Sequence, residues 1–93
     1  MSAPLLQAAL DHVSLDEALS AVERVRGDVD VVEAGTILCY SAGMRAVEAV
    51  RKAAPDRTLV ADLKIADAGE ILAGLAFGAG ADWTTVICAA PRA

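Results

Sequence analysis

The stretch VADLKIADAGEIL, residues 60–72, places two aspartates and a lysine within six positions, directly after an apolar run. In the pattern Asp62-x-Lys64-x-x-Asp67, the first two side chains point to the same face if a strand continues through them. The pattern suits either a solvated turn between a strand and a helix or an active site. The organisation of the rest of the chain bears on which of these it is.

Four short apolar runs divide the sequence, and each predicts a β-strand. They are LLQAAL (5–10), VDVVEAGT (29–36), TLVADLK (58–64) and WTTVICAA (83–90). The runs are nearly continuous in apolar residues, which is typical of strands in a parallel sheet covered by helices.

Three helical patterns separate the runs. The first begins with a capping-box pair, Ser14 and Glu17, and is closed by Gly27. The second is expected from about Gly43 and ends at the segment 54–56. The third follows the opening stretch, and its predicted buried face contains Ala68, Ile71, Leu72, Leu75 and Ala79.

The alternation predicts an α/β fold of the order βαβαβαβ, with parallel strands and right-handed crossovers. Four strands and three helices correspond to the N-terminal half of a (β/α)8 TIM barrel, here a partial barrel domain over residues 1–93. The sequence ends at CAAPRA (88–93), directly after the fourth run, so the first and fourth strands are expected to be open edges. We therefore expect either a part of a longer enzyme or a half barrel that pairs with another copy.

Composition excludes several classes of protein. The 93 residues are 56% hydrophobic and 3% aromatic, which is too apolar for a disordered chain. A formal net charge of −5 argues against binding to nucleic acid or to an anionic membrane surface. No apolar stretch is long enough to span a bilayer, and the N-terminus has no basic region typical of a signal peptide. Cys39 and Cys88 are expected to be reduced, partly buried thiols of a cytoplasmic protein.

Acidic residues stand at the ends of three of the four predicted strands, namely Asp11, Glu33 and Asp62. In a parallel α/β barrel the chemistry occurs where strands end and loops begin. Carboxylates that converge there repel one another unless a cation lies between them, and Mg²⁺ commonly takes one or two protein carboxylates. The ammonium of Lys64 could stabilise a developing oxyanion or transfer a proton.

Each of these residues also has a structural interpretation. Asp11 could cap a turn, Glu33 could be solvated, and Asp67 could be the N-cap of the following helix. Lys64 could be the ion-pair partner of Asp62 or Asp67, and His12 is expected to be exposed. From the pattern alone, a metal-assisted enzyme of the barrel class and a structural α/β module both remain open.

Longer segments add a family resemblance. LQAALD, VDVVEAGTILC, ADLKIADAG and GADWTTVICAA resemble the 3-keto-L-gulonate-6-phosphate decarboxylase family, N-terminal half. That family belongs to the orotidine-5′-phosphate decarboxylase superfamily, whose shared motif is Asp-x-Lys-x-x-Asp. The resemblance covers essentially all 93 residues, and GTILC and ADW-x-TVIC favour this family over the related 3-hexulose-6-phosphate synthases, which catalyse an aldol reaction.

The resemblance implies a role for each candidate residue. Glu33 and Asp62 would ligate Mg²⁺, which would hold substrate oxygens and stabilise the cis-enediolate left when CO₂ departs. Asp11 would bind a substrate hydroxyl, and Lys64 would hydrogen-bond the enediolate oxygen. Asp67 would reach into the partner's site of a homodimer. The product would be L-xylulose 5-phosphate, formed in L-ascorbate catabolism.

The same resemblance indicates what these 93 residues lack. In the family, the phosphate of the sugar-phosphate substrate is bound by the last strands of the barrel, and the proton donors come from the middle of the full-length chain. We therefore expect the chain by itself to be nearly inactive. The alternatives are an aldolase-type 3-hexulose-6-phosphate synthase and a non-catalytic half-barrel assembly module.

Overall fold

The computed structural model describes residues 3–89, which form four parallel β-strands. The strands are β1 (Gln7–Leu10), β2 (Val31–Ala34), β3 (Thr58–Ile65) and β4 (Trp83–Val86). They lie in the sheet in chain order, β1-β2-β3-β4, and each neighbouring pair is parallel. The predicted α/β fold with the strand order of half a (β/α)8 barrel is confirmed. Ala90, the last residue of the fourth apolar run, lies outside the described residues.

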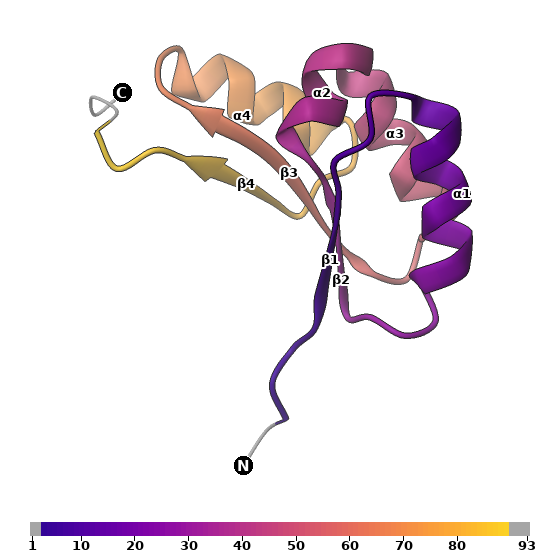
Figure 1. Cartoon of the computed structure of the whole chain (residues 1–93). Helices are drawn as coiled ribbons and strands as arrows, with labels where there is room; N and C mark the ends of the chain where they lie inside the picture. Colours follow the sequence, from indigo (N-terminus) through magenta and orange to yellow (C-terminus); the bar gives the residue numbers. More distant parts are fainter. Residues whose placement is uncertain (1–2, 90–93) are drawn as a thin grey trace.

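Helices cover one face of this sheet (Figure 1). They are α1 (Leu15–Val25), α2 (Thr36–Ala42), α3 (Met44–Ala53) and α4 (Gly69–Gly78). The N-cap of α1 is Ser14, whose hydroxyl oxygen accepts a hydrogen bond from the main-chain N–H of Glu17 at 3.4 Å, as the capping-box pair predicts. Within residues 3–89, no helix is both long and apolar enough to cross a membrane.

The second strand–helix unit differs from its prediction, because it contains two helices. The apolar run was expected to continue as a strand to Thr36, but β2 ends at Ala34 and α2 begins at Thr36. Gly43, with φ of 67°, then separates α2 from α3. The described chain therefore has four helices, and the prediction of three is wrong. Gly35 at the start of α2 has no side chain that could signal an N-cap, which explains why the sequence pattern did not reveal this helix.

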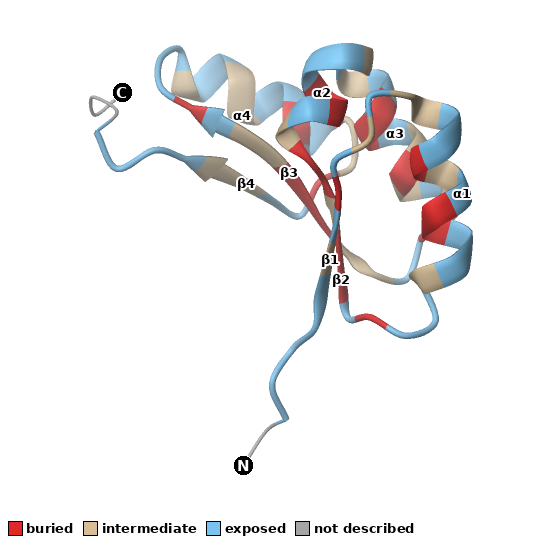
Figure 2. Cartoon of the chain, viewed as in Figure 1, coloured by how far each residue is buried: buried red, intermediate tan, exposed pale blue. Residues whose placement is uncertain are grey.

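The hydrophobic core lies between the sheet and the helices (Figure 2). Its largest fully buried members on this side are Val22, Val32, Leu38, Val47, Val50 and Leu59. Most residues of the edge strands β1 and β4 are exposed or only partly buried, and Trp83 at the start of β4 is 50% exposed. As expected for half a barrel, the sheet is covered by helices on one face only.

The orientation of α4 corrects the predicted buried face of that helix. Ile71 and Leu75 are 69% and 51% exposed, whereas Ala76 is fully buried. Leu72 and Ala79 are partly buried, so only part of the predicted face points inward. Because α4 is apolar on nearly every side, the spacing of its apolar residues could not indicate which side packs on the sheet.

Aspartate side chains fix the register at the amino ends of the strands. Leu6 donates its N–H to Asp30 at 2.8 Å, and Asp30 returns its own N–H to the Leu6 carbonyl. Leu59 and Asp82 exchange the same pair of bonds between β3 and β4. The guanidinium of Arg51 donates to Asp82 at 3.0 Å and to the carbonyls of Ala54, Pro55, Arg57 and Gly80. Arg51 therefore ties α3 to the segments that enter β3 and β4.

We predict that Arg51→Lys lowers the free energy of unfolding by about 2 kcal/mol, because an ammonium cannot reproduce the forked contacts with several carbonyls. Urea denaturation of the purified chain measures this change. The matched control is Arg24→Lys at an exposed position of α1, where Arg24 has one hydrogen bond to Ser20, and the urea midpoint of this variant should not change. Equal midpoints for both variants would show that the Arg51 contacts do not stabilise the fold.

Candidate active site

The sheet brings Asp11, Glu33 and Asp62 together at the carboxyl ends of its strands. Ala9 pairs with Glu33 and Glu33 pairs with Val60, so Asp11 and Asp62 each lie two residues beyond the partners of Glu33. Residues two apart on a strand share a face, so Glu33 and Asp62 lie on the face that the helices leave uncovered. Asp11 directly follows the end of β1, and its charge also acts on Glu33. The three acids predicted at the strand ends are therefore neighbours in space.

Lys64 forms an ion pair with Asp62. Its Nζ lies 2.7 Å from Asp62 Oδ2 and 2.6 Å from the hydroxyl oxygen of Thr36. Lys64 has φ of 49°, a left-handed conformation that is uncommon outside glycine, and the pairing of β3 with β4 shifts register between Ala61 and Ile65. This irregularity of β3, rather than a regular strand, sets the position of Lys64 relative to Asp62.

Thr85 on β4 completes the hydrogen bonding around Asp62. Its hydroxyl donates to Asp62 Oδ1 and accepts the main-chain N–H of Lys64 at 3.0 Å. Asp62 thus has one carboxylate oxygen bound by Lys64 and the other by Thr85. One threonine therefore stabilises both the carboxylate and the irregular backbone at Lys64.

The ionisable groups respond to this arrangement in opposite directions. Burial raises the pKa of Glu33 above its ordinary value, and the nearby Asp62 and Asp11 charges add to the rise, while a 2.7 Å hydrogen bond from Gln7 opposes it. Burial would also raise the pKa of Asp62, but hydrogen bonds from Lys64 and Thr85 outweigh it and the pKa is lowered. The bond to Asp62 raises the pKa of Lys64. The pair is therefore charged near neutral pH.

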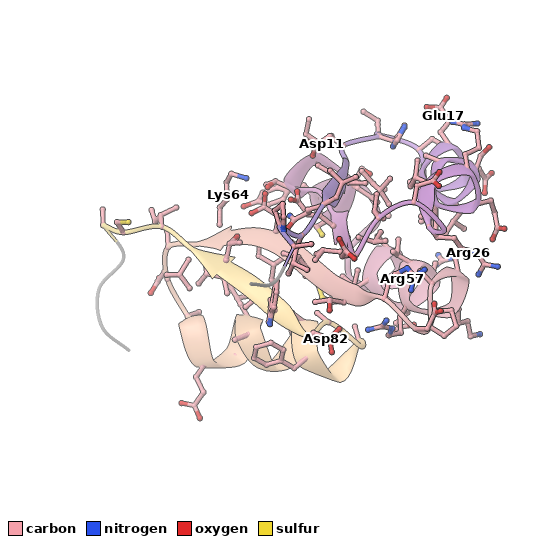
Figure 3. All side chains as sticks on the ribbon, turned by 90° about the horizontal axis from the view of Figure 1, so that it is seen from below. Asp11, Glu17, Arg26, Arg57, Lys64 and Asp82 are labelled. Atoms are coloured by element: carbon pink, nitrogen blue, oxygen red, sulfur yellow. The ribbon has the colours of Figure 1, made fainter. Side chains whose placement is uncertain are left out.

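Asp11 lies against Gly35, the residue before α2. A Cβ atom placed on Gly35 would come 2.0 Å from Asp11 Oδ1 and 2.7 Å from the Leu10 carbonyl oxygen. Only glycine leaves room for the Asp11 carboxylate there. Figure 3 shows Asp11 and Lys64 on the same side of the molecule, away from Asp82 and Arg57.

The remaining candidates lie apart from this cluster. Asp67 is exposed at the start of α4, and its Oδ1 accepts the N–H of Ala68 at 2.8 Å. Within residues 3–89 no hydrogen bond or ion pair joins it to Lys64 or Asp62. The N-cap of α4 is Ala68, so Asp67 does not take the capping position that the sequence left open. His12 is half-buried rather than exposed, and its Nδ1 has no partner among the described residues.

The cysteines are free thiols. Cys39 is buried in α2, and burial raises the pKa of its thiol to about 11, so it is protonated at neutral pH. Cys88 is exposed, in contrast to the expected partial burial.

The chemistry of the cluster fits a hard divalent cation. Glu33 and Asp62 are close enough that the charge of Asp62 adds to the rise in the pKa of Glu33, and both offer oxygen donors. No group of three or more His, Cys, Asp or Glu side chains in residues 3–89 is arranged to hold a metal. Two protein carboxylates match the coordination preference of Mg²⁺, whose remaining coordination positions are usually filled by water and substrate.

Sequence reasoning identified the charged residues but missed their neutral partners. Thr36, Thr85 and Gln7 each donate a hydrogen bond to Asp62 or Glu33, yet none was predicted as a site residue. The available signal was their strand register: Gln7 and Thr85 lie on the same face as the acids. Thr36 belongs to the helix that the pattern did not reveal.

Comparisons with known proteins show which sequence family and which solved structures this chain resembles. The sequence model of the orotidine 5′-phosphate decarboxylase / HUMPS family matches residues 4–93. The 3-keto-L-gulonate-6-phosphate decarboxylase SgbH of Escherichia coli is 60% identical over 93 residues, which are 100% of this chain and 42% of that protein.

Solved structures give the same result. The crystal structure of 3-keto-L-gulonate-6-phosphate decarboxylase from Vibrio cholerae matches with a TM-score of 0.94 and 46% identity, over 96% of this chain and 42% of that one. The crystal structure of a 3-hexulose-6-phosphate synthase matches with a TM-score of 0.93 and 43% identity, over 95% and 42% of the two chains. The chain thus spans about two fifths of the length of these relatives.

We predict that Glu33→Gln stabilises the metal-free chain at neutral pH. Because the folded-state pKa of Glu33 is raised, its ionisation disfavours folding. That cost is absent at low pH and develops as the pH rises through the ordinary value toward the folded-state value. The amide keeps the bond from Gln7 and removes the charge, so Tm should rise by a few degrees, since about 1 kcal/mol moves Tm by about 4–8 °C at this size. Thermal unfolding followed by circular dichroism measures the shift.

The matched control is Glu48→Gln on the exposed surface of α3. It should leave Tm unchanged at every pH. An equal or lower Tm for Glu33→Gln at neutral pH would contradict the inferred cost of ionising Glu33 in the folded state.

Proposed function

The chain belongs to the orotidine 5′-phosphate decarboxylase / HUMPS family, and from this premise we propose that it forms part of the active site of a cytoplasmic decarboxylase acting on 3-keto-L-gulonate 6-phosphate. The products would be L-xylulose 5-phosphate and CO₂, in L-ascorbate catabolism. The observation that carries the proposal is the hydrogen-bonded Asp62–Lys64 pair beside Glu33, at the sheet edge where barrel enzymes perform their chemistry.

The charged residues of this chain would have different roles in the reaction. Loss of CO₂ breaks a carbon–carbon bond and leaves its electron pair on the substrate as a cis-enediolate. The Lys64 ammonium carries three N–H donors and uses two, on Asp62 and Thr36. The third is available to the enediolate oxygen, where negative charge develops. Asp11, held against Gly35, would accept a hydrogen bond from a substrate hydroxyl.

Glu33 and Asp62 would hold Mg²⁺, which would supply positive charge to substrate oxygens as the reaction proceeds. The proposal extends to a homodimer in which Asp67, exposed at the start of α4, contributes to the partner's site. The exposure of Asp67 supports this arrangement, because its carboxylate is accessible to a partner.

The test is decarboxylation of 3-keto-L-gulonate 6-phosphate with and without Mg²⁺. Two proteins are compared: the 93-residue chain, and the same chain joined to the remainder of the Escherichia coli SgbH sequence. We expect Mg²⁺-dependent activity in the joined protein and little or none in the 93 residues, because the relatives are more than twice as long. No CO₂ release from a folded joined protein would overturn the proposal.

A second candidate is supported by the near-equal structural match to a 3-hexulose-6-phosphate synthase. Formaldehyde-dependent consumption of ribulose 5-phosphate by the joined protein would identify that activity. Absence of both reactions would favour a non-catalytic half-barrel module.

A further inference from the structure

The Lys64 ammonium has two partners among the described residues, and one of them is uncharged. Thr36 donates its hydroxyl proton to the main-chain carbonyl of Asp62 at 2.7 Å. Only the oxygen lone pairs then remain for Lys64, whose Nζ lies 2.6 Å away. The main chain of β3 therefore fixes the direction of the Thr36 hydroxyl, independently of the ammonium.

Lys64 needs such a fixed acceptor because its surroundings offer several negative charges. Its side chain is 56% exposed on a flexible stem, and the charges of Asp62, Glu33 and Asp11 all act on it. An ammonium among three carboxylates can settle beside any of them. The neutral acceptor Thr36 selects one position for the ammonium, next to Asp62 and against the start of α2.

The start of α2 is rigid enough to serve this purpose. The N–H of Gly35 donates to the Leu10 carbonyl at 2.9 Å, and the Gly35 carbonyl accepts the N–H of Cys39 at 2.9 Å. Gly35 also packs closely against Asp11 and the Leu10 carbonyl, with no room for a Cβ atom between them. Thr36 is β-branched, which limits its side chain to few rotamers.

We propose that Thr36 is a positioning residue for Lys64: its hydroxyl, oriented by the Asp62 carbonyl, holds the ammonium so that one N–H remains for substrate. The catalytic consequence rests on the proposed function, but the positioning itself does not.

Competitive amine labelling of the 93-residue chain tests the positioning without any activity. The chain has two lysines, Lys52 and Lys64, and exposed Lys52 serves as the internal reference. Trace acetic anhydride followed by peptide mass spectrometry gives the labelling ratio of Lys64 to Lys52. Thr36→Val should raise this ratio about threefold or more, because a hydrogen bond to the amine is lost. Thr36→Ser keeps the hydroxyl and should restore the original ratio.

The matched control is Thr84→Val. Thr84 also donates its hydroxyl to a carbonyl of β3, that of Ala61 at 2.8 Å, but it does not bond Lys64. It should leave the ratio unchanged. Should Thr36→Val fail to fold, as judged by thermal unfolding, Thr36→Ala replaces it. An unchanged ratio in the folded Thr36 variant, or an equal rise in Thr84→Val, would overturn the proposal.

The same variants in the joined protein test the catalytic consequence. Thr36→Val should lower kcat about tenfold through misplacement of the ammonium, with KM changed less than about twofold, and Thr36→Ser should recover kcat. A parent protein that releases no CO₂ would refute the proposed function, while the labelling ratio would still decide the role of Thr36. An active parent with equal kcat in Thr36→Val and Thr84→Val would refute the catalytic consequence.

Discussion

One electrostatic constraint governs the carboxyl end of this sheet: three carboxylates converge there, and the ammonium of Lys64 is hydrogen-bonded to one of them. Parallel strands make the convergence unavoidable, because their carboxyl ends meet at one edge. As a result, the pKa of Glu33 is raised and that of Asp62 is lowered. Asp62 is stabilised as an anion by its partners, whereas burial, together with the neighbouring carboxylates, disfavours the charged form of Glu33.

The irregular geometry of β3 follows from the same constraint. A regular strand would place Lys64 on the face of Asp62, but the observed left-handed φ brings its Nζ within hydrogen-bond distance of both Asp62 and Thr36. Such a conformation costs about 1–3 kcal/mol at a residue with a side chain. The bond from the Lys64 N–H to Thr85 helps to offset that cost, and Thr85 simultaneously binds Asp62. The strained backbone at Lys64 and the Asp62–Lys64 ion pair are therefore both stabilised by Thr85.

The sequence predicted the parallel α/β fold and the three strand-end acids because both depend on local patterns: apolar runs and the residues that end them. It did not predict α2, because a helix that begins after Gly35 has no side-chain N-cap. The predicted burial of Ile71 and Leu75 was wrong, because in a helix that is apolar on nearly every side the sequence does not indicate which side packs on the sheet. Thr36 and Thr85 were missed because a hydroxyl becomes a site residue only through its distance to another chain segment. The assignments of Glu33 and Asp62 to metal and of Asp67 to a dimer remain predictions.

The amino end of the sheet explains how this arrangement is maintained. A slip of one residue between neighbouring strands would turn Glu33 and Asp62 toward the helices and remove them from the open face. Asp30 and Asp82 oppose such a slip. Asp30 exchanges two hydrogen bonds with Leu6, the residue before β1, and Asp82 exchanges two with Leu59, the second residue of β3. Arg51 fixes the second of these points to α3. Register is therefore set by charged groups at the end opposite to the candidate site, where they do not compete with its carboxylates. The carboxyl ends are thereby left to carry the strained backbone of Lys64 and the clustered carboxylates.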